Sequence, residues 1–225
     1  MSRQKKTRTK SIDRSPPRHS RRLQQVRARI AAEAARIMAT EGQLNYHAAK
    51  KKAAQRCGVN DRLALPSNME VEESLRTYQS LYGGSAHREN LDRLRKSALR
   101  AMRILDSFNP RLVGPVLEGT AGPHSRIALQ AFADSPDALI LHFLEHGEPF
   151  RQEQRQIRWH NGESRITQLI VFDLDEAEIE VALFELKDLR QAPPSPVDGK
   201  PQRRATRDEL EALQSDSHLS QAQIS

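Results

Sequence analysis

Residues 113–129 have the sequence VGPVLEGTAGPHSRIAL, and this stretch separates two parts of the 225-residue chain that have different hydrophobic patterns. Gly114 and Gly119 interrupt its apolar residues, as glycines often do where a strand ends in a tight turn. After Ser125, the aliphatic residues Ile127 and Leu129 alternate with other residues, and a period of two is typical of a β-strand. The stretch therefore predicts two strands joined by turns.

The residues that follow continue the strand pattern. Ser135 suits the N-cap of a helix and Pro136 its first position. Short breaks at Asn161-Gly162 and Asp175-Glu176-Ala177 suit hairpins. This half of the chain predicts a mixed or antiparallel sheet with one inserted helix. We expect strands over 111–119, 125–134, 155–160, 166–174 and 178–186, and the helix over 136–147.

The residues before position 110 have a helical period instead. Apolar residues recur at three- and four-residue spacing over 23–42, and three further helices are expected over 46–57, 69–82 and 87–108. We therefore predict an α+β protein, in which a helical N-terminal half precedes a mixed β-sheet domain with flanking helices. Its expected parts are a disordered basic tail (1–22), a helical module (23–84), an α/β domain (85–192) and a proline-rich segment with a short C-terminal helix (193–225).

Positive charge is concentrated at the N-terminus. Residues 1–22 carry nine Lys/Arg against Asp13, and residues 23–60 carry seven against two glutamates, so the first 60 residues sum to +13. The whole chain has a net charge of +7, which leaves −6 for the other 165 residues. A basic tail of this kind either neutralises the phosphates of a nucleic acid or keeps the protein in solution. The sequence leaves both interpretations open.

Composition also limits the location of the protein. No apolar run approaches the roughly 18 residues that a membrane span needs. The first charged residues are not followed by the apolar core of a signal peptide. We therefore expect a cytoplasmic protein that does not bind membranes. Cys57 is the single cysteine, which excludes an internal disulfide and a zinc site made of clustered thiolates.

The first two predicted helices resemble the first two helices of DNA-binding regulators of the tetracycline-repressor type. A short link that contains Gly42 joins them. The next stretch, residues 61–75, has Pro66 and several acids where a recognition helix would have to approach phosphates. The alternative function for the chain is nevertheless nucleic-acid binding through the basic N-terminal arm and the helical module.

Residues 113–129 resemble, without gaps, the central motif of minimal nucleotidyltransferases of the polymerase-beta-like superfamily. In that family, a strand, a Gly-Ser turn, a Gly-Thr-Ala turn and a strand written roughly as SDIDL follow a helix. The matching residues are Gly114, Gly119, Thr120, Ala121, Ser125, Ile127 and Leu129. The resemblance implies that the domain binds a nucleotide or a macromolecular partner. The ligand-binding residues that it implies are Gly114, Gly119, Thr120, Ser125 and Arg126.

The residues that hold metal ions in that family are replaced here. The two carboxylates that bind magnesium correspond to Arg126 and Ala128, and neither side chain ligates magnesium. Pro115 replaces the serine of the first turn and has no amide hydrogen to offer a phosphate. Glu180 corresponds to the third carboxylate and is the catalytic candidate. We therefore expect a weakened or inactive enzyme without a metal cofactor, in which Arg126 pairs with Glu180 or with a bound phosphate.

A third hypothesis rests on two histidines. His142 and His146 are four residues apart on a predicted helix, which is the spacing of two metal ligands on one face. The string HFLEH, residues 142–146, resembles the reversed motif of inverted zinc peptidases. The sequence offers no third ligand, and an exposed polar helix end explains the same residues. We rank a zinc hydrolase after the nucleotidyltransferase-like and nucleic-acid-binding hypotheses.

Overall fold

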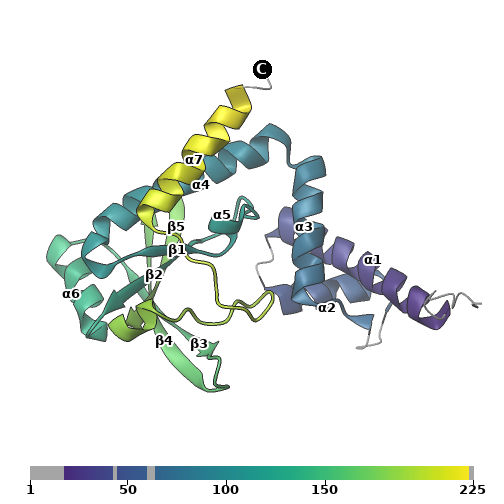
Figure 1. Ribbon diagram of the computed structural model, residues 1–225, viewed down its shortest axis with the longest axis horizontal. Coiled ribbons are helices and arrows are strands. Elements are labelled where there is room, and N and C mark those ends of the chain that lie inside the picture. The colour runs from purple at the N-terminus through teal and green to yellow at the C-terminus, as the bar shows by residue number, and fades with distance from the viewer. Residues whose placement is uncertain (1–17, 43–44, 60–63, 223–225) are drawn as a thin grey trace, which may run out of the picture.

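The computed structural model describes residues 18–42, 45–59 and 64–222 of the chain. It has an α+β fold, in which a helical half precedes a five-stranded mixed sheet, as predicted. Figure 1 shows a helical module at one side of the molecule and the sheet, with its own helices, at the other. Within the described ranges, no helix combines the length and the apolar character needed to cross a membrane.

The helical module consists of α1 (Arg18–Glu41), α2 (Tyr46–Arg56) and α3 (Asn68–Tyr82). Its core contains small and aliphatic side chains. Ile30, Ala34 and Ile37 of α1 are fully buried in a cluster with alanines of α2. Ser67 and Glu70 form a capping box at the start of α3, in which the side chain of each residue accepts a hydrogen bond from the backbone amide of the other.

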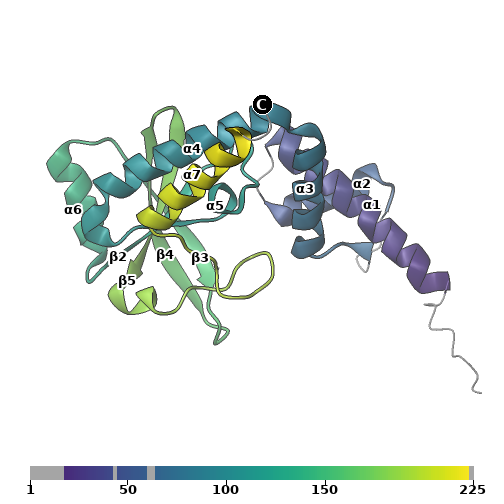
Figure 2. The same cartoon turned by 45° about the horizontal axis from the view of Figure 1, so that its top comes forward.

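Three helices cover one face of the sheet: α4 (Gly84–Ile104), α6 (Pro136–His146) and α7 (Arg207–Ala222). Figure 2 shows α4 and α7 side by side across this face. Met102, Phe143 and Leu210 of these helices share the main core with Ile127 and Val181 of the strands. Full burial of one such aliphatic side chain contributes about 1.5–3 kcal/mol, so this layer stabilises the sheet.

The sheet contains β1 (Arg111–Val113), β2 (Ile127–Ala133), β3 (Arg151–Arg158), β4 (Ser164–Leu174) and β5 (Ala177–Glu185). The strand order is β1-β2-β5-β4-β3. β2 and β5 are parallel, and the other neighbours are antiparallel. Because successive residues face opposite sides of a strand, Ile127 and Leu129 face the helices, whereas Ala128 and Gln130 face the other side. We call this other side of the sheet the open face.

The proline-rich residues 193–205 form a strap that joins the sheet to the helical module. In Figure 1 the strap leaves the sheet toward α2 and α3 and then returns. A backbone hydrogen bond of 2.8 Å from Gln202 to Pro193 closes the base of this hairpin. At its far end, the side-chain amide of Asn68 donates to the carbonyl of Pro196 (2.7 Å).

Two expectations about local structure were wrong. The strand expected over 111–119 ends at Val113, because Gly114 adopts φ 71° and ψ −155° and Pro115 then begins the short helix α5 (Pro115–Glu118). Residues 18–22 of the expected disordered tail belong to α1. Residues 1–17 of that tail lie outside the described residues.

A two-residue turn, Asp175-Glu176, joins β4 to β5. Both residues have positive φ angles, 52° and 63°. Tight hairpin turns with two positive φ angles favour Asn, Asp or Gly at the first position and Gly at the second, so Asp175 suits this turn and Glu176 does not. A side chain with a β-carbon costs roughly 1–2 kcal/mol in this region of backbone conformation. An ion pair between Asp175 and Arg100 of α4 holds the turn against the helix layer.

Substitution Glu176→Gly should raise the free energy of unfolding by about 0.5–1 kcal/mol. Glycine adopts a positive φ without a clash, and this gain exceeds the extra freedom that glycine has in the unfolded chain. Urea unfolding followed by circular dichroism measures the change. Glu176→Ala is the control because it keeps the β-carbon. An equal gain in both variants would show that removal of the carboxylate, rather than the backbone angle, is responsible.

Candidate functional site

Three positions of the sequence resemblance meet on the open face. In the parallel register of β2 and β5, Ala128 pairs with Glu180. Arg126, the residue before β2, extends along the same face, and its Nη1 lies 3.4 Å from Oε2 of Glu180. The side chains expected to lie together are therefore neighbours in the structure.

Charged side chains from β3 and β5 surround Arg126. Its Nη1 donates to Oε2 of Glu153 on β3 (3.0 Å), and its Nε donates to Glu178 on β5. Arg151 donates to the other oxygen of Glu178. We call the six residues of this group the Arg–Glu cluster: Arg126, Arg151, Arg155, Glu153, Glu178 and Glu180.

Glu180 is the most buried member of the Arg–Glu cluster, with a side chain that is 6% exposed. Arg155 donates one hydrogen bond of 2.6 Å to each of its carboxylate oxygens. This fork-shaped contact is the strongest geometry for an arginine–carboxylate pair. Both oxygens of the catalytic candidate are therefore already bound by a guanidinium group.

The charges of the Arg–Glu cluster balance, since three guanidinium groups face three carboxylates. Hydrogen bonds from Arg126 hold the pKa of the Glu153 carboxyl below its usual value. The same hydrogen bonds raise the pKa of the Arg126 guanidinium. Arg126 and Glu153 therefore form an ion pair at neutral pH, and this pair links the edge strand β3 to the start of β2.

Magnesium does not fit this arrangement. Ala128 offers no ligand atom, and Arg126 puts a positive charge where the resemblance would require a carboxylate. Across residues 18–42, 45–59 and 64–222, no three His, Cys, Asp or Glu side chains are placed to hold a metal ion. The carboxylates of the open face are partners of arginine instead.

The turn at Gly114 packs against Ala128, which lies beside Glu180 on the open face. Its backbone angles, φ 71° and ψ −155°, are almost restricted to glycine. A β-carbon added at Gly114 would lie 3.8 Å from the Cβ of Ala128, so the turn packs on the residue that replaces a carboxylate. Pro115 follows as the first residue of α5, and Gly119 ends α5 with φ 82°. The two glycines thus allow one helical turn between β1 and the loop to β2.

The other residues implied as ligand-binding hold the loop after α5 in place. The carbonyl of Gly119 lies 3.1 Å from Nε2 of His87. The carbonyl of Thr120 accepts a hydrogen bond of 2.9 Å from the side chain of Gln79. The hydroxyl of Ser125 accepts from the amide three residues before it (2.9 Å). These contacts attach the loop to α3 and α4 rather than to the Arg–Glu cluster.

A cavity of about 270 Å³ opens beside the Gly114 turn. Its walls come from three parts of the chain: Tyr46 and Arg76 of the helical module, Gly114 and Thr120 of the turn, and residues 195–203 of the strap. We call it the strap cavity. Pockets for small ligands usually measure about 300–1,000 Å³, so its volume is near the lower end of that range.

Glu118 lies between two arginines of the strap cavity. Its Oε2 is 3.2 Å from Arg76 on α3 and 3.8 Å from Arg203 on the strap. Lys200 adds a third cation from the strap, and two other acids also line the cavity. A carboxylate thus bridges guanidinium groups from the helical module and from the strap, which lie on different walls.

Tyr46 and Glu72 form the wall that the helical module contributes. The Tyr46 hydroxyl donates a hydrogen bond of 2.5 Å to Oε2 of Glu72. Burial raises the pKa of the Tyr46 hydroxyl, and the neighbouring carboxylate raises it further. The hydroxyl therefore remains a hydrogen-bond donor at neutral pH.

Arg204 fixes the strap to the open face. Its Nε donates to Gln130 of β2 (2.6 Å), and its Nη1 donates to the carbonyls of Asp188 (2.9 Å) and Leu189 (3.2 Å). The guanidinium lies 5.0 Å from the ring centre of Phe132. Burial lowers the pKa of Arg204 to about 10, which keeps it charged at neutral pH.

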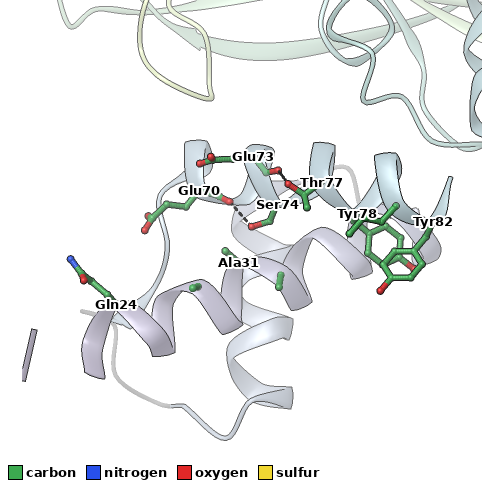
Figure 3. Close-up of a pocket in the computed structure, with 11 residues that line it drawn as sticks. Gln24, Ala31, Glu70, Glu73, Ser74, Thr77, Tyr78 and Tyr82 are labelled. Carbon is green, nitrogen blue, oxygen red and sulfur yellow. Dashed lines mark hydrogen bonds between the residues drawn. The ribbon is translucent and has the colours of Figure 1, made fainter. Parts of the chain in front are cut away.

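A larger hollow of about 470 Å³ lies between α1 and α3. Figure 3 shows the rings of Tyr78 and Tyr82 at one end and Gln24 at the other. The hydroxyls of Ser74 and Thr77 donate to carbonyls of their own helix, at 2.8 and 2.9 Å. These hydroxyls are therefore not available to orient a ligand, unlike the convergent polar groups of most binding sites.

The two histidines of the zinc hypothesis contact each other and their own helix. Nδ1 of His146 lies 2.7 Å from the carbonyl oxygen of His142. His142 packs edge-on against Phe108, and burial lowers its pKa. The described part of the chain supplies no third ligand beside them, so the geometry does not support a zinc site.

Glu153 was not among the predicted neighbours of Arg126, because the sequence pattern predicted a strand that begins at residue 155, whereas β3 begins at Arg151. The charges of Arg151, Glu153 and Arg155 alternate in sign at every second residue, and this period would have placed all three on one face. The strap cavity had no comparable signal, because its walls come from distant parts of the sequence.

The comparisons with known proteins identify no relative. No model of a known protein family matches the sequence, and no curated protein matches it.

Substitution Arg126→Gln should lower the free energy of unfolding at pH 7 by about 1–2 kcal/mol. A fully buried carboxylate that loses its partner costs more, but the side chain of Arg126 is 31% exposed, and solvent reduces the effect. Urea unfolding at several pH values measures the difference between the two proteins.

This difference should shrink as the pH falls. The pKa of Glu153 is lower in the folded protein than its ordinary value of 4.5, so the stabilisation is complete above that value and is lost as the pH falls through the folded pKa. Arg158→Gln, an exposed change on the same strand, should have no such dependence. A difference that stays constant from pH 7 to pH 3 would contradict the ion-pair explanation.

Proposed function

We propose that the sheet domain is nucleotidyltransferase-like, that it binds a nucleotide in the strap cavity, and that it does not perform magnesium-dependent transfer. The resemblance of residues 113–129 motivates the family. Support also comes from the position of Arg126, Ala128 and Glu180, which are neighbours on the open face. The observation that carries the proposal is the Glu118 carboxylate between Arg76 and Arg203.

Arg126 is the reason for expecting no metal-dependent chemistry. A divalent ion about 4 Å from a guanidinium would be repelled by about 8 kcal/mol at an effective dielectric constant of 20. In-line attack on a nucleotide phosphate needs metal ions to neutralise the attacking and leaving oxygens. At this position, the residues of the Arg–Glu cluster pair with one another and do not hold metal ions.

The strap cavity offers a way to bind phosphate without a metal. Arg76 and Arg203 approach the same oxygen of Glu118 from different walls. A phosphate group has the charge and the acceptor oxygens to replace that carboxylate, and arginine is well suited to hold it. The backbone at Gly114 has no side chain, so a ligand can approach the turn closely.

Nucleotide binding should therefore be independent of magnesium. Isothermal titration with ATP is expected to give the same affinity in EDTA as in magnesium, and labelled ATP should transfer no nucleotide to added acceptors. Loss of binding in EDTA, or magnesium-dependent transfer, would refute the proposal. Absence of any ATP binding under both conditions would also refute it.

Substitution Glu118→Gln should increase the affinity for ATP about two- to fivefold. The phosphate would then no longer compete with a carboxylate, and one exposed ion pair corresponds to at most about 1 kcal/mol. Arg76→Gln should weaken binding by a similar factor. The matched control is Glu211→Gln, which breaks an ion pair with Arg103 between α4 and α7. Equal effects of the Glu118 and Glu211 changes would place the ligand outside the strap cavity.

A further inference from the structure

The outward side of α1 carries a row of exposed arginines. Arg21, Arg22 and Arg29 are exposed, as is Gln25 between them. At 100° per residue, these positions lie on the side of the helix opposite to the buried residue Ala34. We call Arg21, Arg22, Gln25 and Arg29 the α1 basic stripe.

Most other cations of α1 and α2 are paired with acids. Arg27 pairs with Glu70 on α3 (2.7 Å). Four further ion pairs of 2.6–3.2 Å involve Glu33 or Glu41 and the side chains of Arg36, Lys52 and Arg56. These pairs neutralise the C-terminal half of α1 and the adjacent surface of α2.

The arginines of the α1 basic stripe differ, because no described carboxylate lies within ion-pair distance of them. Arg29 donates a hydrogen bond of 2.7 Å to the carbonyl of Cys57, a neutral group that orients the guanidinium without cancelling its charge. Along the sequence, the stripe continues into residues 1–17, which carry six Lys/Arg against Asp13. Within α1, the arginines without a carboxylate partner are thus concentrated in its N-terminal half.

The side of α1 opposite the basic stripe distinguishes between two kinds of polyanionic partner, a membrane surface and a nucleic acid. A basic helix that lies on a membrane surface inserts an apolar face into the lipid. Ile30, Ala34 and Ile37, which would form that face, are fully buried in the core of the helical module. The α1 basic stripe therefore offers charge without an insertable apolar surface, which suits a nucleic acid and not a membrane.

The composition of α1 also favours a duplex over a single strand. Proteins that hold single strands usually stack the bases on aromatic side chains. Residues 18–42 contain no Phe, Trp or Tyr. The phosphate groups of a duplex, by contrast, need only cations at suitable spacing. The α1 basic stripe, from Arg21 to Arg29, spans about 12 Å of helix, so it can follow the phosphates along part of one duplex turn.

We propose that the α1 basic stripe is a docking surface for the phosphate backbone of a nucleic-acid duplex. Arg21 and Arg22 contact phosphates, and Arg29 extends the contact by two turns of helix. Binding is independent of base sequence, because the stripe presents no side chain in a groove-reading arrangement. This function is separate from the nucleotide site, and neither requires the other.

The test is a triple variant, Arg21→Gln/Arg22→Gln/Arg29→Gln, in the full chain. Fluorescence anisotropy with a labelled 20-base-pair DNA duplex measures affinity from 50 to 200 mM salt. Each lost phosphate contact should reduce the slope of log affinity against log salt by about 0.9, so the three changes should reduce it by about 3. We expect at least a tenfold loss of affinity at 100 mM salt. Thermal unfolding checks that the variant is folded.

The charge-matched control is Arg93→Gln/Arg158→Gln/Arg190→Gln, which removes three exposed arginines from the sheet domain. It should change affinity less than twofold. An equal loss in both variants would reduce the interaction to net charge and overturn the proposal. An unchanged affinity of the stripe variant would assign binding to residues 1–17 alone and would also overturn it.

Two further arms identify the polyanion. An RNA duplex of the same length is titrated in parallel, and the duplex bound more tightly at 150 mM salt is assigned as the partner, with the same loss of slope in the stripe variant. Tighter binding to a single-stranded oligonucleotide than to either duplex would contradict the proposal. So would binding to vesicles with 30% anionic lipid in the absence of duplex binding.

Discussion

The parallel pairing of β2 with β5 determines which charges meet on the open face, because it places Ala128 beside Glu180 and brings Arg126 next to Glu178. A slip of one residue would turn these side chains toward the helix-covered face, whose core is apolar. Glutamates there would be buried without guanidinium partners, at a cost of several kcal/mol. The register of the central strands and the Arg–Glu cluster therefore depend on each other.

The Arg–Glu cluster balances the charge of its carboxylates with guanidinium groups from the same chain. Carboxylates that lie close together repel one another, and a bound cation normally relieves that repulsion. Here, Arg126 contacts all three glutamates of the cluster and supplies the compensating charge from within the chain. The same contacts join the exposed edge strand β3 to the centre of the sheet. In the function that we propose, the residues at this position stabilise the sheet and take no part in metal-dependent chemistry.

The other arginines of the molecule differ in how far nearby acids neutralise their charge. Arg204 is half-buried and holds the strap by hydrogen bonds to neutral groups, which keeps the wall of the strap cavity in place. Arg76 and Arg203 share Glu118, and Arg76 also lies 3.5 Å from Glu72, so an anion in the strap cavity would compete with these carboxylates. The α1 basic stripe has no acid within reach among the described residues. Arg204 is thus a structural anchor, whereas binding of a ligand by Arg76 and Arg203 and docking by the α1 basic stripe are the roles that we propose.

Hydrophobic period alone distinguished the helical half from the sheet half, because the periods of 3.6 and 2 are local properties of the chain. Together with the motif resemblance, it also indicated that Arg126 and Glu180 would be neighbours. The end of β1 at Gly114 was not predictable, since Val116 and Leu117 continue the apolar run and one helical turn cannot be told from a strand by its period. Only the tertiary structure decided the partners of Arg126 and the walls of the strap cavity. These residues come from segments far apart in sequence, and their contacts depend on strand order and on the packing of the strap, which no local pattern encodes.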